Sequence, residues 1–459
     1  MREDELCALV EAQRISFARG ETLPLPVRIM ALERLRLCVK RYENEICEAL
    51  YVDLGKCAAE CRLSEIDPVR AECSYMLRNI RRLAREKTVC VPPSLPFSRG
   101  RVRMSPLGNV LILSPWYEPF AQAMLPLVDA IAAGNTVVVK PSAYAPRTGE
   151  VIASILAYCM LPCHAAVVMG GREENRLLMT QRFDHIFFSG SERVGREVLR
   201  HAAETLTPVT LMLGGKNPVL VDHTARLDVA ARRIVFGKLL SCGQTSAAPD
   251  FVLAEESVCS ALTDAICLEI RRQLGDDPLT NPQYGRIVNE KQFTRLIGLL
   301  DSGTLAHGGT FDAQSLRIAP TVLHHVPWDS PVMRQEILGP ILPILSVQSM
   351  EEAVELVAGM PQPLAMYLFS RDRRTVAMLR ERCRFGGGCV NDTLTHQAGG
   401  SLAISAVGAS GMGAYRGKRG YETFSHVQSM VERPFAPDPA MRYQPYETMK
   451  ERFLRRLGR

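Results

Sequence analysis

The feature that most constrains this chain is an alternation of short apolar runs with helical segments across its middle. Val110 to Leu113, Val137 to Val139 and Ile186 to Phe188 are apolar runs, and each stops at a turn. The stretches between them space their apolar residues as a helix does, as in Phe120 to Ala133. Short buried strands that alternate with helices predict a parallel sheet covered on both faces. Such a sheet binds ligands at the carboxyl ends of its strands.

Two further regions flank this alternation. The first 90 residues or so have helical spacing, with Gly55 as a plausible helix end, and a proline-rich break follows at Pro92 and Pro93. A second alternating region begins near Leu213 and includes the apolar run Val219 to Val221. Because 459 residues are long for one core, we expect two or more packed lobes.

Composition excludes several classes of protein. The 47% hydrophobic and 23% charged fractions are those of a globular protein, and the net charge of +6 is scattered, which argues against a nucleic-acid partner. The acidic N-terminus does not resemble a secretion signal, and the most apolar region, Val151 to Met169, is broken by Pro162 and too short for a membrane span. Fourteen scattered cysteines favour reduced thiols in a cytoplasmic protein, with no metal site, over disulfides or a zinc site.

Ten collinear motifs across residues 20 to 430 carry a more specific signal. Together they resemble the aldehyde dehydrogenase superfamily, and within it the class 3 or fatty-aldehyde branch. The motifs are PLGNVLILSPW (106–116), LVDAIAAGNTVVVKPS (127–142), RFDHIFFSGSERVG (182–195), LTPVTLMLGGKNP (206–218), CGQTSAAPD (242–250), YGRIVNEKQF (284–293), PVMRQEILGPILPI (331–344), PLAMYLFS (363–370), GGGCVND (386–392) and GASGMGAYRGKRGYETFSH (408–426).

The resemblance implies an α/β fold with three parts and a homodimeric assembly. A Rossmann-like nucleotide-binding domain is expected from residues 1–80 and 104–212, and an α/β catalytic domain from 213–392. A small bridging element that pairs protomers is expected from residues 81–103 and 393–435, and a basic tail from 436–459.

The resemblance also implies a site for NAD or NADP. The turn from Gly190 and Ser191 to Gly195 follows an apolar run and opens a helix, where glycine backbone and a helix N-terminus can receive a pyrophosphate; a plain strand-to-helix turn is the alternative reading. Lys140 matches the lysine that binds the adenosine ribose. Ala143 stands where a ribose-binding glutamate is usual, so NADP is no worse than NAD.

The nicotinamide end of that site is altered as well. Glu336 matches the glutamate that holds the nicotinamide ribose, and Leu338 replaces the usual phenylalanine beside it. Trp116 is retained, although a core role would explain it equally well. The resemblance therefore implies weak binding of NAD or NADP.

The three catalytic positions of the family are all substituted. Ser246, in GQTSAAPD, occupies the position of the nucleophilic cysteine; Met212 occupies that of the general-base glutamate, and Tyr117 that of the oxyanion-binding asparagine. A serine hydroxyl needs an adjacent base, and a thioether cannot accept a proton at neutral pH. A fourth departure is Ala403 to Ala406, where relatives have PFGG.

These observations leave three functions open. The resemblance implies NAD(P)-dependent oxidation of a small-molecule aldehyde to a carboxylic acid, but the substitutions favour an impaired enzyme or a pseudoenzyme. An active oxidoreductase with a relocated nucleophile is the second hypothesis, with Cys242, four residues before Ser246, as the displaced thiol. The third is a subunit that stabilises an active paralogue.

Overall fold

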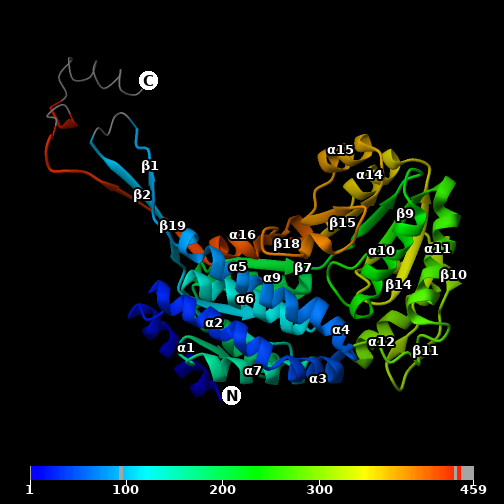
Figure 1. The fold of residues 1–459 in the computed structure, drawn as a ribbon, viewed down its shortest axis with the longest axis horizontal. Coiled ribbons are helices and arrows are strands. Elements are labelled where there is room, and N and C mark those ends of the chain that lie inside the picture. The colour runs from blue at the N-terminus through cyan, green and yellow to red at the C-terminus, as the bar shows by residue number, and fades with distance from the viewer. Residues whose placement is uncertain (1, 93–96, 439–441, 446–459) are drawn as a thin grey trace.

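Two seven-stranded sheets and a three-stranded arm organise the chain. The computed structural model describes residues 2–92, 97–438 and 442–445, so most of the expected basic tail lies outside the described residues. Figure 1 shows the two sheets side by side in separate lobes, with the arm projecting from the first lobe. In the described part of the chain, no helix combines the length and apolarity that a bilayer crossing requires.

The first sheet has the strand order β17-β18-β7-β6-β3-β4-β5, and its five strands from β7 to β5 are parallel. This confirms the parallel sheet predicted from the alternating runs. Its strands are β3 (Asn109–Leu113), β4 (Thr136–Lys140), β5 (Ala165–Val167), β6 (His185–Gly190), β7 (Val209–Leu213), β17 (Ile404–Ala406) and β18 (Gly411–Tyr415). Its crossover helices are α6 (Pro119–Ala133), α7 (Pro146–Cys159), α8 (Arg172–Thr180) and α9 (Glu192–Thr205).

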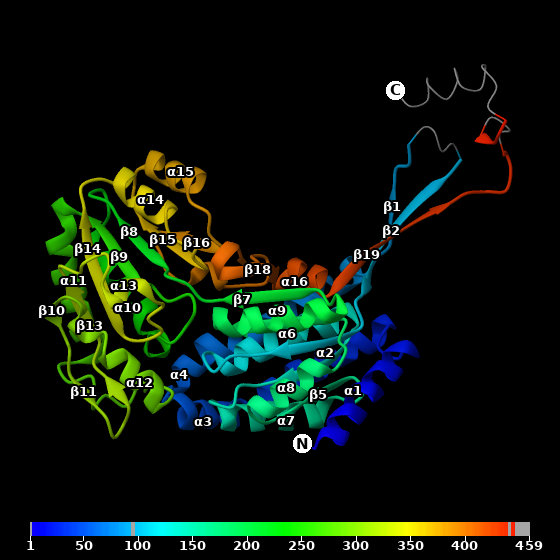
Figure 2. The same ribbon diagram turned by 180° about the vertical axis from the view of Figure 1, so that it is seen from behind.

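The predicted helical start of the chain forms a bundle against this sheet (Figure 2). Its members are α1 (Glu3–Ala18), α2 (Leu25–Arg41), α3 (Glu43–Leu54), α4 (Ala58–Cys61), the π-helix η1 (Arg62–Ile66) and α5 (Asp67–Leu83). The bundle is fastened by its apolar face and by polar caps. At the end of α3, the Asp53 carboxylate accepts hydrogen bonds from the Thr148 backbone N–H (2.8 Å) and hydroxyl (2.7 Å), which anchors the start of α7.

The second sheet has the order β10-β13-β14-β9-β8-β15-β16 and is parallel except at β10. Its strands are β8 (Pro218–Val221), β9 (Phe251–Glu255), β10 (Thr304–His307), β13 (Thr321–His324), β14 (Ile341–Val347), β15 (Ala365–Phe369) and β16 (Gly387–Val390), with the hairpin β11 (Phe311–Asp312) and β12 (Arg317–Ile318) beside it. The helices of this lobe are α10 (Leu227–Leu239), η2 (Leu240–Gly243), α11 (Glu256–Leu274), α12 (Glu290–Ile297), η3 (Leu300–Ser302), α13 (Pro331–Arg334), α14 (Met350–Ala358), α15 (Arg373–Arg382) and η4 (Thr395–Gln397).

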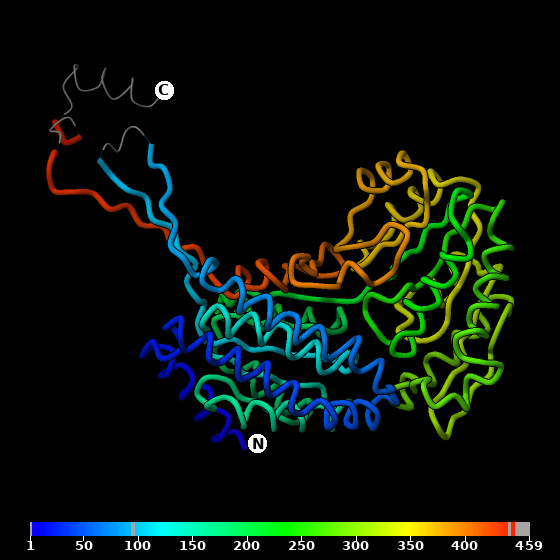
Figure 3. Tube along the Cα trace, in the orientation of Figure 1, coloured from blue at the N-terminus to red at the C-terminus, as the bar shows by residue number. Residues whose placement is uncertain are grey.

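The arm consists of β1 (Lys87–Val89), β2 (Arg99–Pro106) and β19 (Ser425–Glu432), all antiparallel. Part of the segment 393–435, which is expected to belong to the bridging element, lies with the first sheet. β17 pairs with β18, which pairs with β7; η5 (Gly408–Ser410) contacts β7, and α16 (Gly417–Thr423) contacts β18. Figure 3 shows the chain returning along the first lobe before it enters the arm. Backbone pairing decides this placement, and motif order along the chain does not reveal it.

Candidate active site

The fold brings Met212 and Tyr117 to the same end of the first sheet. Met212 lies near the end of β7, and its Cα partner in β6 is Ser189. Tyr117 follows β3 in the loop that leads to α6, and its hydroxyl lies 3.4 Å from the Ser189 hydroxyl. Because parallel strands end at one edge, two residues distant in sequence meet there. Both side chains are buried.

Ser246 lies in the connection from α10 to β9. That connection begins with three left-handed residues, Ser241, Cys242 and Gly243, whose φ angles are 55°, 59° and 73°. A Cβ on Gly243 would lie 2.3 Å from the Gly339 carbonyl oxygen, so only glycine fits at this turn. The turn packs the nucleophile loop against the segment that carries Glu336.

A buried amide then holds the Ser246 loop. The Asn217 side chain donates to the Ser246 carbonyl (2.7 Å) and the Ala248 carbonyl (3.0 Å), and its oxygen accepts from the Ala365 N–H (2.8 Å). The loop is also tied from β15, because the Tyr367 hydroxyl donates to the Ala247 carbonyl at 2.6 Å. Ser246 is thereby positioned at the inner edge of the second sheet, with a relative exposure of 6%.

Glu118 connects the two halves of the site. It adjoins Tyr117 in the chain and is buried, and the Thr245 hydroxyl, next to Ser246, makes only a minor contribution that lowers its pKa and forms no hydrogen bond with it. Burial outweighs this effect and raises the pKa of Glu118 above its usual range. Met212 and Tyr117 therefore meet through Ser189 at the end of the first sheet, whereas Ser246 is held from the second sheet by Asn217. The sequence analysis did not identify Glu118.

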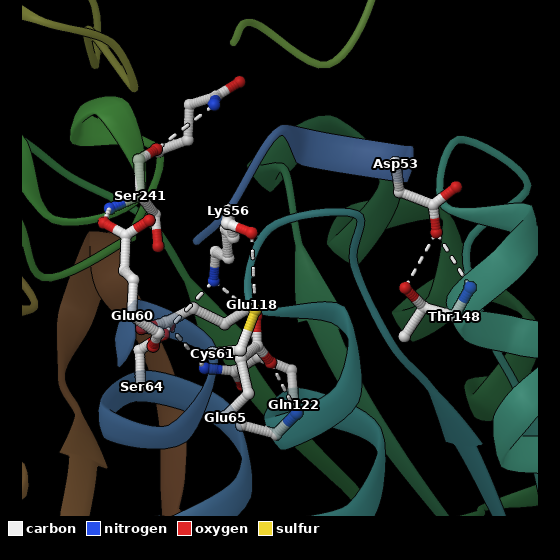
Figure 4. Close-up of polar contacts among 12 residues, drawn as sticks. Asp53, Lys56, Glu60, Cys61, Ser64, Glu65, Glu118, Gln122, Thr148 and Ser241 are labelled. Atoms are coloured by element: carbon white, nitrogen blue, oxygen red, sulfur yellow. Dashed lines mark hydrogen bonds and ion pairs between the residues drawn. The ribbon is translucent and has the colours of Figure 1, made fainter. Parts of the chain in front are cut away.

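Glu118 belongs to a buried polar cluster at the inner end of the site (Figure 4). Lys56 donates to the Glu65 carboxylate at 2.5 Å, and the other Glu65 oxygen accepts from the Ala121 N–H at 2.9 Å. Glu60 accepts from the Ser241 N–H at 2.5 Å, so a helix of the first lobe caps the left-handed turn of the second. Charged residues spaced within an otherwise apolar helical stretch were the only sequence signal for this cluster.

What these groups can do chemically is limited. The Ser246 hydroxyl is a weak nucleophile without a base, and the Met212 thioether cannot supply one. Burial raises the pKa of the Tyr117 phenol above its ordinary value, so the phenol stays neutral and can only donate or accept a hydrogen bond. Its hydroxyl is directed at Ser189, and it fills space where relatives have an asparagine.

The environment of Cys242 argues against a relocated nucleophile. The thiol is 1% exposed in the core of the second lobe. Burial raises its pKa to about 12, although a hydrogen bond with Tyr284 opposes the shift. A reactive cysteine requires thiolate character and access, and Cys242 has neither.

The turn from Gly190 to Gly195, which is expected to bind a pyrophosphate, leads into a helix N-terminus without a side-chain cap. Ser191 is the N-cap of α9 and makes no side-chain cap hydrogen bond, so the first N–H groups of this 14-residue helix are available to an anion. Packing also requires the glycines: a Cβ on Gly190 would lie 2.7 Å from the Phe188 ring, and one on Gly195 2.9 Å from Leu213. The binding and structural readings of this turn are therefore compatible.

Lys140 ends β4 and is 3% exposed. Its ammonium donates to the Pro141 carbonyl at 2.8 Å and the Gly170 carbonyl at 2.7 Å, and burial lowers its pKa to about 8. The lysine is therefore held at the carboxyl edge of the first sheet, where a nucleotide ribose would lie. Trp116 lies at the same edge, with its ring 5.6 Å from that of Tyr117 in an edge-to-face arrangement.

Glu336 lies between the lobes, where its carboxylate accepts a hydrogen bond from the Gly215 N–H at 3.3 Å. The segment is positioned by Asp250, which pairs with Lys216 and accepts from the Ile337 N–H at 2.9 Å. Burial, reinforced by the charge of Asp250, raises the pKa of Glu336 to about 8. Leu338 follows in a left-handed conformation, with φ of 46°. These residues fit a nicotinamide ribose, whose hydroxyls a carboxyl can bind.

Comparisons with known proteins agree with this geometry. The model of the aldehyde dehydrogenase family matches residues 2–430. The chain is 40% identical over 433 residues to the 4,4'-diaponeurosporen-aldehyde dehydrogenase of Staphylococcus aureus, covering 94% of both chains. It is 38% identical over 443 residues to a dog protein named "aldehyde dehydrogenase, dimeric NADP-preferring", covering 96% of this chain and 98% of that protein. A solved structure of S. aureus AldH in a substrate-bound state superposes with a TM-score of 0.96 at 38% identity, covering 99% of both chains.

The raised pKa of Glu336 predicts a pH-dependent effect on stability. Since its folded pKa of about 8 lies above the ordinary glutamate value of 4.5, the folded state holds this proton more tightly, and the stability that this supplies is lost as pH rises toward 8. Glu336→Gln should remove that loss, so the variant should gain up to about 1.4 kcal/mol per pH unit relative to wild type between pH 5 and 7.5. Partial exposure of the side chain will reduce this value. Urea unfolding of both proteins across this range checks it, and a difference independent of pH would contradict it.

Proposed function

Because this chain belongs to the aldehyde dehydrogenase family, we propose that it is a catalytically impaired member that retains weak NAD or NADP binding. The observation that supports the proposal is the chemistry of Ser246, Met212 and Tyr117, of which Met212 and Tyr117 meet through Ser189 at the end of the first sheet. The family's reaction needs a nucleophile, a base for the deacylating water and an oxyanion donor. In this chain a weak hydroxyl, a thioether and a phenol stand at those positions.

Nucleotide binding is the function that the remaining residues support best. Lys140, the α9 N-terminus and Glu336 are the groups that would hold the dinucleotide, which when bound accepts a hydride from the substrate. Ala143 lacks the carboxylate that would repel a 2′-phosphate, so NADP should bind at least as well as NAD. The name of the dog relative, which states a preference for NADP, supports this expectation.

We also propose that the protein is a homodimer joined through the arm. Val427 and Val431 are four residues apart on β19, so their side chains lie on one face of the strand, and they are 62% and 54% exposed. Apolar side chains exposed in this way mark interaction surfaces. The dog relative is named as dimeric. A subunit that pairs with an active paralogue would use the same surface, so the third hypothesis from the sequence differs from this one only in the identity of the partner.

The second candidate function is an active oxidoreductase in which Glu118 serves as the base. It adjoins the oxyanion position in the chain, and burial raises its pKa above the usual range of a carboxyl, as is common for catalytic acids and bases. Gln122 donates to Glu118 at 3.3 Å and accepts from the Tyr415 hydroxyl at 3.2 Å, which orients the carboxyl. In this version Ser246 attacks the aldehyde and Glu118 takes its proton.

The first prediction concerns catalysis. Wild-type protein should produce no NADH or NADPH above background with a panel of medium-chain and aromatic aldehydes. Ser246→Cys alone should give a single-turnover burst without steady turnover, because Met212 cannot activate water. Adding Met212→Glu and Tyr117→Asn should convert the burst into turnover, since the groups act as a unit. Stopped-flow absorbance of the reduced nicotinamide distinguishes these outcomes.

Steady wild-type turnover would contradict impairment, and two variants would then assign it. Loss of that turnover in Glu118→Gln would establish the second candidate function. Loss of that turnover in Cys242→Ala would instead support the hypothesis that Cys242 is a relocated nucleophile. Glu60→Gln is the matched control, because it changes a carboxyl of the same buried cluster that contacts Ser241 and not Thr245.

The second prediction concerns the cofactor. Either dinucleotide at about 100 times its Kd should add roughly 2.7 kcal/mol of stability. Each kcal/mol raises Tm by about 2–4 °C for domains of 150–250 residues, so a thermal scan will detect it. Lys140→Met should weaken the shift, and Arg232→Met, an exposed basic residue on α10, serves as control. The absence of any shift with millimolar NAD or NADP would refute nucleotide binding.

The third prediction concerns assembly. Light scattering at micromolar concentration should give the mass of a dimer, because large apolar interfaces are obligate. Val427→Glu with Val431→Glu should shift the mass toward the monomer by placing charge on the apolar face of β19. Leu206→Glu, on a side chain 90% exposed at the end of α9, should leave the dimer intact. A monomeric wild type at this concentration would overturn the proposal.

A further inference from the structure

A cysteine, a histidine and a glutamate from two distant parts of the chain meet at the outer edge of the first lobe. Glu21 lies in the turn between α1 and α2, and Cys163 and His164 lie in the turn between α7 and β5. One ligand atom from each side chain lies within 4.8 Å of the other two. We propose that these three residues form a zinc site, independent of the catalytic machinery and of the proposed function.

The His164 imidazole is the observation that first points to a ligand. Its Nε2 atom is shielded from solvent and meets the Glu21 carboxylate at 3.5 Å, beyond ordinary hydrogen-bond length. Such a long contact satisfies a shielded polar nitrogen only in part. Coordination of a cation by Nε2 would satisfy it and draw the carboxylate and thiol toward the same point.

The backbone that carries the ligands is held in place from both sides. The buried Gln13 side chain of α1 donates to the Pro162 carbonyl at 3.0 Å and the Val137 carbonyl at 2.9 Å, which ties α1 to the turn before Cys163. The His164 carbonyl accepts from the Val137 N–H at 2.9 Å, as the turn enters β5. The ligands therefore approach on fixed supports, and only side-chain rotation is needed to reach bonding distance.

The carboxylate also has an orienting partner. The Ser16 hydroxyl, itself buried, donates to a Glu21 oxygen at 2.6 Å. Such outer hydrogen bonds fix metal-binding carboxylates in direction. Arg19 lies 4.0 Å from the other Glu21 oxygen, but its side chain is 72% exposed and is free to turn away.

The donor set selects the metal. A thiolate, an imidazole and a carboxylate are the ligands that zinc takes in four-coordinate sites, and hard cations such as Mg²⁺ and Ca²⁺ avoid the sulfur. The thiolate and carboxylate together neutralise the charge of Zn²⁺. With side-chain exposures of 22% for His164 and 39% for Glu21, the site opens to solvent, so a water molecule completes the fourth position.

A metal ion bound at this site would have a structural role. It would link the N-terminal helices to the strand that ends the first sheet, since Glu21 and Cys163 are far apart in the chain. The sequence analysis expected no metal site because the cysteines are scattered, and only folding brings this one to a histidine and a glutamate. A ligand that binds only the folded chain must raise its stability.

Cobalt titration of the full-length protein tests the site, because Co²⁺ replaces zinc and reports a thiolate ligand by a charge-transfer band in the near ultraviolet. The expected result is one Co²⁺ per chain with this band, its displacement by Zn²⁺, and a Tm raised by a few degrees in zinc. Cys163→Ser should abolish the band, and His164→Gln and Glu21→Gln should each weaken binding by at least about tenfold, the scale on which even outer-shell changes act.

Controls separate this site from the other thiols and from misfolding. Cys267→Ser, which changes another partly buried cysteine, on α11 of the second lobe, should bind cobalt as wild type does. Because the three ligands are only partly buried, the metal-free Tm of each variant should match wild type; if one fails to fold, the other two still decide. A charge-transfer band that persists in Cys163→Ser, or no metal bound at micromolar concentration, would overturn the proposal.

Discussion

The geometry of the active site depends on the hydrogen bonds of one buried amide, Asn217. Its side chain donates to the carbonyls of Ser246 and Ala248 and accepts from the N–H of Ala365. The backbone carbonyl of Asn217 accepts from the Asp250 N–H at 2.8 Å. These bonds join the starts of β8, β9 and β15 to the nucleophile loop. A buried amide that is satisfied in this way tolerates few alternative loop conformations, because any of them leaves polar atoms unpaired in a low dielectric. The scaffold that presents residue 246 is therefore intact, whatever residue stands there.

Burial disfavours the charged forms of the ionisable side chains around the site. Burial raises the pKa of Glu118 and of Glu336, and it lowers the pKa of Lys140 and of Lys238 to about 8. The common cause is removal from water, which penalises whichever form is charged. Met212 in place of a glutamate removes one further carboxylate from this region. Because it is uncharged, Met212 adds no repulsion to the buried carboxyls of this region.

The sequence predicts the elements that depend on a local pattern of residues. The parallel first sheet and the helical start could be predicted because apolar periodicity encodes them, and short motifs gave the assignment of Ser246, Met212 and Tyr117 to the catalytic positions. Contacts between residues that are far apart in the sequence could not be predicted. Glu60 caps Ser241 across 181 residues, and Glu118 lies beside Thr245 only once the lobes have packed. The placement of β17 and β18 escaped prediction for the same reason, since strand pairing is chosen by the sheet edge that remains open.

The sequence by itself determined the family, the chemistry available at each catalytic position and the loss of thiolate, base and amide from them. These are properties of residue types in a motif, and no packing can give a thioether a proton affinity. Only the tertiary structure decided that Cys242 is a buried core thiol, that Glu60 caps Ser241, and that Glu21 of one turn meets Cys163 and His164 of another. Burial and proximity set those outcomes, because a side chain's pKa and partners depend on what surrounds it after folding.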